Sequence, residues 1–250
     1  MARFDEKYKY CPDVLAAVVN NGRSGSHYLI HCLSNHPDIH APREEVWGSR
    51  FRRHYPASGQ PSVEYMLGMT YCVRGYKAAV AKFNYRRTRE SHLGVTFKEN
   101  DFKVIHLKRR NYVRQGVSGY LAKNRRVYHA DDEDNEPTVD RIDPKWMVRQ
   151  CRKYEKREER FDNIISSWGL DSIEVIYENL LFDGEGTTSH QIPEGEAKRI
   201  CDFLDVGYYD LYQTRMHRTV GLTLPEMIGN WDEIEARIAR TKYAYCLETI

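Results

Sequence analysis

"VVNNGRSGSHYLIHCLSNHPDIHAPREE", residues 18–45, is the stretch that decides the fold of this chain. An apolar run that begins near residue 13 stops at two asparagines, and a Gly-Arg-Ser-Gly-Ser turn leads directly into an amphipathic segment. The run predicts a strand buried on both faces, and the segment predicts a helix that ends near the "HP" pair at 36–37. Glycine, serine and arginine at this junction fit an anion-binding loop, but they also fit an ordinary strand-to-helix turn. This stretch alone leaves both interpretations open.

Further predicted strands and helices follow along the rest of the chain. Apolar runs at 76–85, 102–110 and 172–180 predict further strands, of which the last two are expected to be buried. Residues 62–74, 111–126, 145–168 and 194–206 predict helices, and the apolar stripe of the 145–168 helix is expected to be core. The alternation predicts a central parallel sheet flanked by helices, and no repeat or linker divides the sequence. We expect a single α/β domain over residues 1–250.

Charge and cysteine usage narrow the class of protein. The 250 residues hold 38 Lys and Arg against 36 Asp and Glu, a net charge of +2, which disfavours a nucleic-acid partner. The six cysteines show no paired spacing, and they predict reduced structural thiols. No apolar stretch predicts a signal peptide or a membrane span, so we expect a soluble, cytoplasmic protein. The sequence does not indicate an oligomeric state.

A second basic segment, "VIHLKRRNYVRQGVSGYLA", covers residues 104–122. Three basic residues follow the strand directly, and Ser118 lies eight residues beyond Arg110. An arginine together with a hydroxyl suits a phosphate monoester. A basic loop followed by a solvent-facing helix serine explains the segment equally well when it is taken alone.

The sequence lacks the signatures of several common nucleotide-binding and metal-binding sites. The nucleotide-kinase signature GxxxxGK[ST] and the dinucleotide signature GxGxxG are both missing from the loop. Histidines 27, 31, 36 and 40 raise the question of zinc, but no HExxH is present and "NHP" breaks the helix before His36, so we expect no metal. Lys82, in the 76–85 strand, is expected either to reach an acceptor or to be a solvated strand-end lysine.

Taken together, the two segments resemble the sulfotransferases that use 3'-phosphoadenosine 5'-phosphosulfate (PAPS). "RSGSHYL" at 23–29 is similar to the 5'-phosphosulfate loop of that family, and "HLKRRNYVRQGVS" at 106–118 is similar to its 3'-phosphate segment. Looser similarities follow in the same order at 34–45, 175–183 and 224–231, so the resemblance spans roughly residues 13–250. Two positions depart from the pattern: His27 stands where the family usually has Thr or Ser, and Tyr112 where many members have Pro.

The resemblance implies a P-loop-like sulfotransferase fold. It also implies an enzyme that moves a sulfuryl group in line from PAPS to an acceptor hydroxyl, on a small molecule or a glycan, without a metal. The implied cofactor-binding residues are Gly22, Arg23, Ser24, Gly25, Ser26, His27, Tyr28, Arg110, Ser118 and Arg218. The implied catalytic residues are Arg23, for the charge on the leaving phosphate, and Glu44 or Glu45, as the base. Two alternatives stay open, namely a nucleotide-dependent phosphotransferase with a degenerate loop and a non-catalytic module that binds a sulfated or phosphorylated ligand.

Overall fold

The computed structural model describes residues 11–42, 71, 73–84, 90–125, 141–181, 191–213 and 223–248. The chain divides into two compact units. Unit 1 comprises Met1–Lys108 and Phe161–Thr214, and unit 2 comprises Arg109–Arg160 and Arg215–Ile250. Each unit is described by itself, and the single domain over residues 1–250 stays a prediction.

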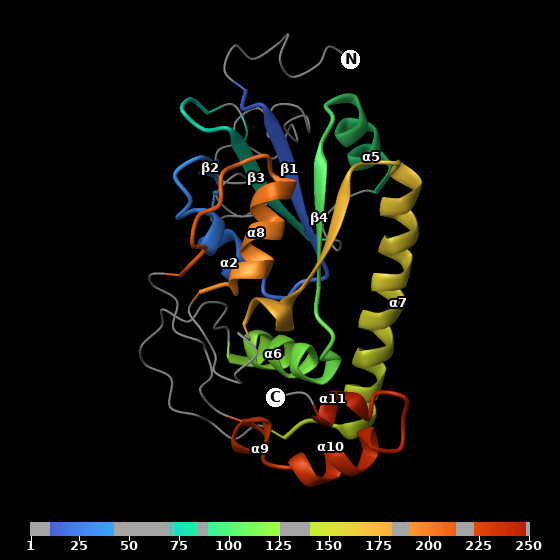
Figure 1. The fold of residues 1–250 in the computed structure, drawn as a ribbon. Helices are drawn as coiled ribbons and strands as arrows, with labels where there is room; N and C mark the ends of the chain where they lie inside the picture. The colour runs from blue at the N-terminus through green and yellow to red at the C-terminus, as the bar shows by residue number, and fades with distance from the viewer. Residues whose placement is uncertain are drawn as a thin grey trace. The chain divides into compact units, whose positions relative to one another are not determined.

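Unit 1 is built on a five-stranded sheet in which every pairing is parallel (Figure 1). The strands are β1 Val14–Asn20, β2 Ile39–His40, β3 Ala78–Asn84, β4 Lys103–Lys108 and β5 Ser172–Ile176. Their order is β2-β3-β1-β4-β5, so that β1 lies in the centre and its carboxyl end leads into the Gly22–Ser26 turn. The expected central parallel sheet is confirmed.

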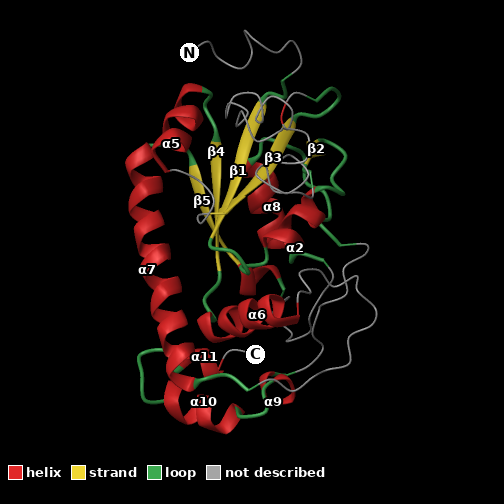
Figure 2. Cartoon of the chain, turned by 180° about the vertical axis from the view of Figure 1, so that it is seen from behind, coloured by secondary structure: helices red, strands yellow, loops and turns green. Residues whose placement is uncertain are grey.

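Helices cover both faces of this sheet, as Figure 2 shows from behind. The helices of unit 1 are α2 Ser26–Leu33, α5 Glu90–Glu99, α8 Glu194–Phe203 and the last part of α7 Pro144–Trp168. Val14, Ala16 and Val18 of β1 pack in one core cluster with residues of α2 and α8. Leu15, Ala17 and Val19 pack in a second cluster with α5 and the end of α7. Because helices cover both faces of the sheet, the residues of β1 that point to one face and those that point to the other are all apolar from Val14 to Val19.

The 172–180 segment differs from the prediction of a buried strand. Strand β5 lies at the edge of the sheet, and its first three residues are exposed or half-buried. Residues Tyr177–Leu180 form a 3-10 turn, η1, instead of continuing the strand. An edge strand has a partner on one side only, so its outer positions remain polar and accessible. Elements β2 and α5 were not predicted, and the helix expected at 62–74 lies almost wholly outside the described residues.

Unit 2 is helical. It contains α6 Tyr112–Arg125, the first part of α7, α9 Leu224–Met227, α10 Trp231–Ile238 and α11 Tyr245–Glu248. The predicted stripe of α7 is buried throughout, with Met147 and Cys151 in the core of unit 2 and Phe161, Ile165 and Trp168 in unit 1. Pro144 occupies the first helical position, where its missing N–H costs nothing. Gly169, with φ of +64°, ends the helix as predicted.

Two further expectations from the sequence concern the state of the cysteines and the presence of a membrane-spanning helix. Five cysteines, Cys11, Cys32, Cys151, Cys201 and Cys246, carry thiols and not disulfides. Within the described ranges, no helix combines the length and the apolar character needed to cross a membrane.

Candidate functional site

The turn between β1 and α2 has an unusual backbone. Gly22, Arg23 and Gly25 have φ of +71°, +57° and +84°, in the left-handed region. For the arginine this conformation costs on the order of 1 kcal/mol. Such turns direct successive backbone N–H groups toward one concave side, which is how many proteins bind anions. Strain retained at one loop supports a functional hypothesis for that loop.

Asn20 fixes the start of the loop. Its side chain is fully buried, its Nδ2 donates to the carbonyl of Phe83 at 3.0 Å, and its Oδ1 accepts the N–H of Gly22 at 2.9 Å. A Cβ atom on Gly22 would lie 2.9 Å from Nδ2 of Asn84 at the end of β3. The loop therefore lies directly against the neighbouring strand end, and the positive φ of Gly22 favours glycine at this position.

Tyr177, the first residue of η1 directly after β5, fixes the other side of the loop. Its ring packs on Gly25 so closely that a Cβ atom there would lie 2.9 Å from Cγ and nearer still to Cδ2 and Cε2. One helical turn further, Tyr28 donates from its hydroxyl to the carbonyl of Leu180 at 3.3 Å. The loop and the first turn of α2 are thus held by two different strand ends.

Ser24 is the most informative residue of the loop. Its side chain is fully buried, and its hydroxyl has no hydrogen-bond partner among the described residues. A buried polar group left in this state costs about 1–3 kcal/mol. Helix α2 also has no side-chain cap at its N-cap residue, Gly25, in the described part of the chain. A ligand with acceptor oxygens at this helix N-terminus would satisfy the hydroxyl and the first N–H groups together.

Lys82 brings a positive charge to the same turn. It was expected either to reach an acceptor or to be solvated, and the solvated interpretation is wrong because its side chain is fully buried. Its Nζ lies 3.1 Å from Nδ1 and 3.0 Å from Nε2 of His27, the second residue of α2. Together with Arg23 and the helix N-terminus, this lysine makes the turn a concentration of positive charge. Such a site favours an anion.

The expected 3'-phosphate residues lie in unit 2. Arg110 is exposed and directly precedes Asn111, whose Oδ1 accepts the N–H of Arg114 at 2.9 Å and so caps helix α6. Asn111 also donates to the carbonyl of Cys246 at 2.8 Å, which anchors the start of α6 on α11. Ser118 is half-buried in the middle of α6. The predicted helix start near Asn111 is confirmed, while the binding roles of Arg110 and Ser118 stay predictions.

A charged cluster lies at the carboxyl end of β4 in unit 1, and the sequence analysis did not predict it. Lys108 forms ion pairs at 2.6 Å with Asp162 of α7 and with Glu174 of β5. His106 places Nδ1 3.2 Å from Asp162 Oδ1. Burial, together with the Lys108 charge, lowers the pKa of His106 to about 3, so the ring is neutral and donates to Asp162. Lys108 is thereby committed to two carboxylates, and the cluster stabilises the junction of β4, β5 and α7.

The remaining candidates are either undescribed or already explained. Glu44, Glu45 and Arg218 lie outside the described residues. His36 accepts the N–H of Asp38 at 3.0 Å and contacts the carbonyl of Gly207 at 2.9 Å, so its two ring nitrogens serve the fold. The described part of the chain has no group of three or more His, Cys, Asp or Glu that could bind a metal ion.

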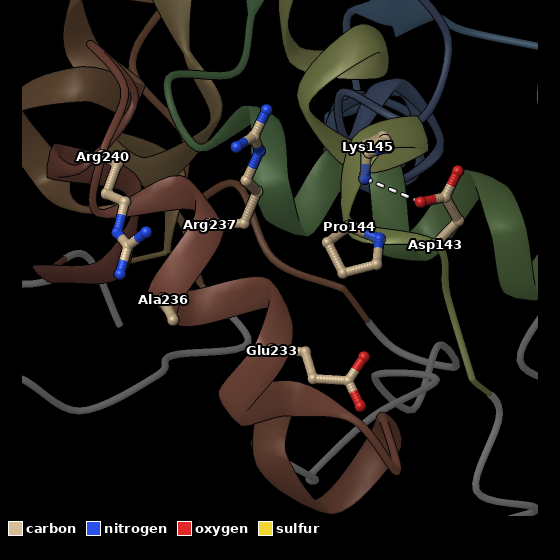
Figure 3. A pocket seen from close by; sticks show the side chains of 7 residues that line it. All are labelled: Asp143, Pro144, Lys145, Glu233, Ala236, Arg237 and Arg240. Carbon is tan, nitrogen blue, oxygen red and sulfur yellow. Dashed lines mark hydrogen bonds between the residues drawn. The ribbon is translucent and has the colours of Figure 1, made fainter.

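Figure 3 shows a shallow hollow in unit 2 between the start of α7 and α10. The residues that line it are Asp143, Pro144, Lys145, Glu233, Ala236, Arg237 and Arg240. Asp143 accepts the N–H of Lys145 at 2.8 Å, and Glu233 forms an ion pair with Arg141 at 2.7 Å. Both carboxylates therefore have partners close by, and the side chains that line the hollow carry charges of both signs.

Several solved sulfotransferase structures are similar to this chain. One, from Alicyclobacillus acidocaldarius, has a TM-score of 0.47 and 17% identity, over 94% of this chain and 95% of that chain. The sulfotransferase domain of the curacin biosynthetic pathway has a TM-score of 0.49 and 14% identity, over 87% and 83%. A mouse sulfotransferase in complex with PAP has a TM-score of 0.42 and 13% identity, over 98% and 92%. No family model and no curated protein matches the chain. Any functional proposal therefore has to rest on the loop residues themselves.

Proposed function

We propose that the β1–α2 loop binds the 5'-phosphosulfate of PAPS and that the protein transfers its sulfuryl group to an acceptor hydroxyl. The observation that carries this proposal is the buried hydroxyl of Ser24, which has no partner in the described residues. It lies in a left-handed turn at the N-terminus of α2, where Lys82 and Arg23 add positive charge. A tetrahedral anion with several acceptor oxygens satisfies all of these groups together.

The loop acts on charge that develops during the transfer. The acceptor oxygen forms a bond to sulfur while the bond from sulfur to the 5'-phosphate oxygen breaks, and the bonding electrons remain on the leaving phosphate. Arg23, the Ser24 hydroxyl and the first N–H groups of α2 stabilise that growing charge. Donors placed in advance at such a position each contribute on the order of a hundredfold or more in rate.

Other residues complete the proposal from the sequence resemblance. Glu44 or Glu45 removes the acceptor proton, and Arg110 and Ser118 bind the 3'-phosphate, with Arg218 as a further cofactor contact. Ser26, buried as the first residue of α2, adds a second hydroxyl beside the loop. The acceptor is a small molecule or a glycan.

A phosphotransferase is less well supported by the described residues. Its Mg2+ would need a carboxylate at a strand end. Asp162 of α7 and Glu174 of β5 lie beside Lys108, the last residue of β4, and both form ion pairs with it. A binding module without turnover has the same loop requirements as the enzyme, and an activity measurement distinguishes the two.

A thermal-shift titration tests the proposal. Adenosine 3',5'-bisphosphate (PAP) should stabilise the protein, by about 2.7 kcal/mol at a hundred times its Kd, whereas ATP should not. Ser24→Ala, whose affinity is expected to be at least about tenfold lower, should keep at most about 1.4 kcal/mol of this stabilisation at the same PAP concentration. Ser34→Ala, at the far end of α2 where the hydroxyl donates to the His31 carbonyl at 2.8 Å, should keep the full stabilisation. Equal shifts with ATP and PAP would contradict PAPS chemistry, and binding without sulfuryl transfer to any alcohol would favour the binding module.

A further inference from the structure

The carbonyl oxygen of Arg110 is held by a helix from the far end of the chain. Tyr245, the first residue of α11, donates its hydroxyl hydrogen to this oxygen at 3.4 Å. The thiol sulfur of Cys246, the next residue, lies 3.8 Å from the same oxygen. Within the local turn, the N–H of Tyr112 donates to it at 3.0 Å. The orientation of the peptide group after Arg110 therefore depends on α11 as well as on the turn itself.

The buried side chain of Asn111 makes a second connection to α11. Its Nδ2 donates to the carbonyl of Cys246 at 2.8 Å, and its Oδ1 accepts the N–H of Arg114 at 2.9 Å in the first turn of α6. One side chain thus joins the start of α6 to α11. Two consecutive residues, Arg110 and Asn111, are both bound to the same short helix.

Helix α11 is itself fixed in the core of unit 2. Cys246 is fully buried in the cluster that includes Cys151 of α7. Tyr243, two residues before α11, is also buried, and its hydroxyl donates to Glu155 of α7 at 2.7 Å. Arg110, in contrast, is exposed, and a long side chain of this kind has many rotamers. An anchored helix beside it can hold its backbone in one conformation.

We propose that Tyr245 is a positioning residue for the 3'-phosphate of the donor and acts through the carbonyl of Arg110. This inference rests on the proposed function, in which Arg110 binds that phosphate. The side chain of Arg110 leaves the backbone in a direction set by the adjoining peptide groups, so a turn with one conformation keeps the guanidinium in one region. Without the Tyr245 hydroxyl, a smaller fraction of molecules has Arg110 in the binding orientation, and the apparent affinity falls with that fraction.

Isothermal titration calorimetry with PAP and with adenosine 5'-monophosphate (AMP) tests this role, because the two ligands differ only in the 3'-phosphate. Tyr245→Phe should raise the Kd of PAP about two- to tenfold, the equivalent of one neutral hydrogen bond, and leave the Kd of AMP unchanged. Asn111→Ser keeps a side-chain oxygen for the helix cap but is too short to reach Cys246, so it should have the same selective effect. Tyr120→Phe is the matched control, because the Tyr120 hydroxyl donates to the carbonyl of Arg141 at 3.1 Å. This variant should bind both ligands like the wild type.

A double substitution shows whether Tyr245 acts through Arg110. In an Arg110→Ala background, Tyr245→Phe should cause no further loss of PAP affinity, because the side chain that it positions is gone. A further loss of the same size would overturn the inference. Equal weakening of PAP and AMP by Tyr245→Phe, or no weakening of either, would also overturn it and leave the proposed function standing.

Two other outcomes concern the function on which the inference rests. If Arg110→Ala left the ratio of the PAP and AMP affinities unchanged, Arg110 would not bind the 3'-phosphate, and the inference would fail with that assignment. If PAP did not bind the wild-type protein, the proposed function and the inference would both be overturned.

Discussion

Replacing Gly25 with alanine tests the close packing of the loop on Tyr177. The added Cβ would lie 2.9 Å from Cγ of the ring and closer to two other ring atoms, whereas real Cβ contacts essentially never fall below 3.0 Å. The residue also has φ of +84°, which alanine adopts only with strain. Two separate costs therefore act on one substitution.

The structure provides a control that separates these costs. Gly75 has the same φ of +84°, but no heavy atom lies within 4 Å of a Cβ placed on it. Gly75→Ala should lose only the backbone term, about 1–2 kcal/mol. Gly25→Ala should lose that amount and a further 1–3 kcal/mol or so for the steric overlap with the ring. The expected difference between the two variants is the overlap term.

Urea unfolding of both variants measures the free energies. In a Tyr177→Ala background the overlap disappears, so Gly25→Ala should then cost no more than Gly75→Ala. Equal losses for the two glycine variants in the wild-type background would refute the packing argument. A large loss at Gly25 that persists without the ring would also refute it.

Four further outcomes are expected. Ser24→Ala should leave the free energy of unfolding unchanged or raise it by about 1 kcal/mol, since it removes an unsatisfied buried hydroxyl, and should weaken PAP binding about tenfold or more in the same calorimeter. Arg23→Ala should lower kcat for sulfuryl transfer about a hundredfold with a smaller change in PAP affinity, and near-normal turnover would contradict its role. Arg110→Ala should weaken PAP by about 1.5–3 kcal/mol but leave adenosine 5'-phosphosulfate, which lacks the 3'-phosphate, nearly unaffected. Because the pKa of His106 falls from 6.5 to about 3 on folding, the unfolded chain binds the extra proton between these values, and stability should decrease as pH falls below 6.5, by at most about 1.4 kcal/mol per pH unit. Urea titrations of His106→Gln should show a flatter pH dependence.

The sequence predicted those elements whose buried residues form a recognisable local pattern, either an apolar run or an apolar stripe at helical spacing. β1 and β4 are apolar runs because both of their faces are covered, and α7 shows its stripe over 25 residues. Helices α9 and α11 have four residues each, too few for a helical period to be visible. Both are anchored by packing, because Leu224 and Cys246 are buried in the core of unit 2. Helix α9 also has a local start signal, the capping box of Thr223 and Glu226, which the sequence analysis did not use.

The candidate site was predictable in the same partial way. Glycines and serines after a buried strand indicated where an anion would bind, and that placement stays a prediction. The contact between His27 and Lys82 depends on the register of β3 against β1, which pairs Lys82 with Val18. The ring of Tyr177 on Gly25 depends on where β5 ends. Both contacts join residues far apart in the chain, so they could be seen only after the strands were placed.

The division of the chain into two units has a consequence for the order in which it folds. The chain leaves unit 1 after Lys108, returns to it at Phe161, and enters unit 2 again at Arg215. The core of unit 2 joins Val113–Cys151 to Leu224–Cys246. During synthesis, the segment Val113–Cys151 is therefore made before β5 and α8, and its partner Leu224–Cys246 is made after them. Closing such widely separated contacts is slow compared with forming a single helix hairpin. The segment Leu224–Cys246 is therefore expected to complete unit 2 late, after β5 has joined β4 in the sheet.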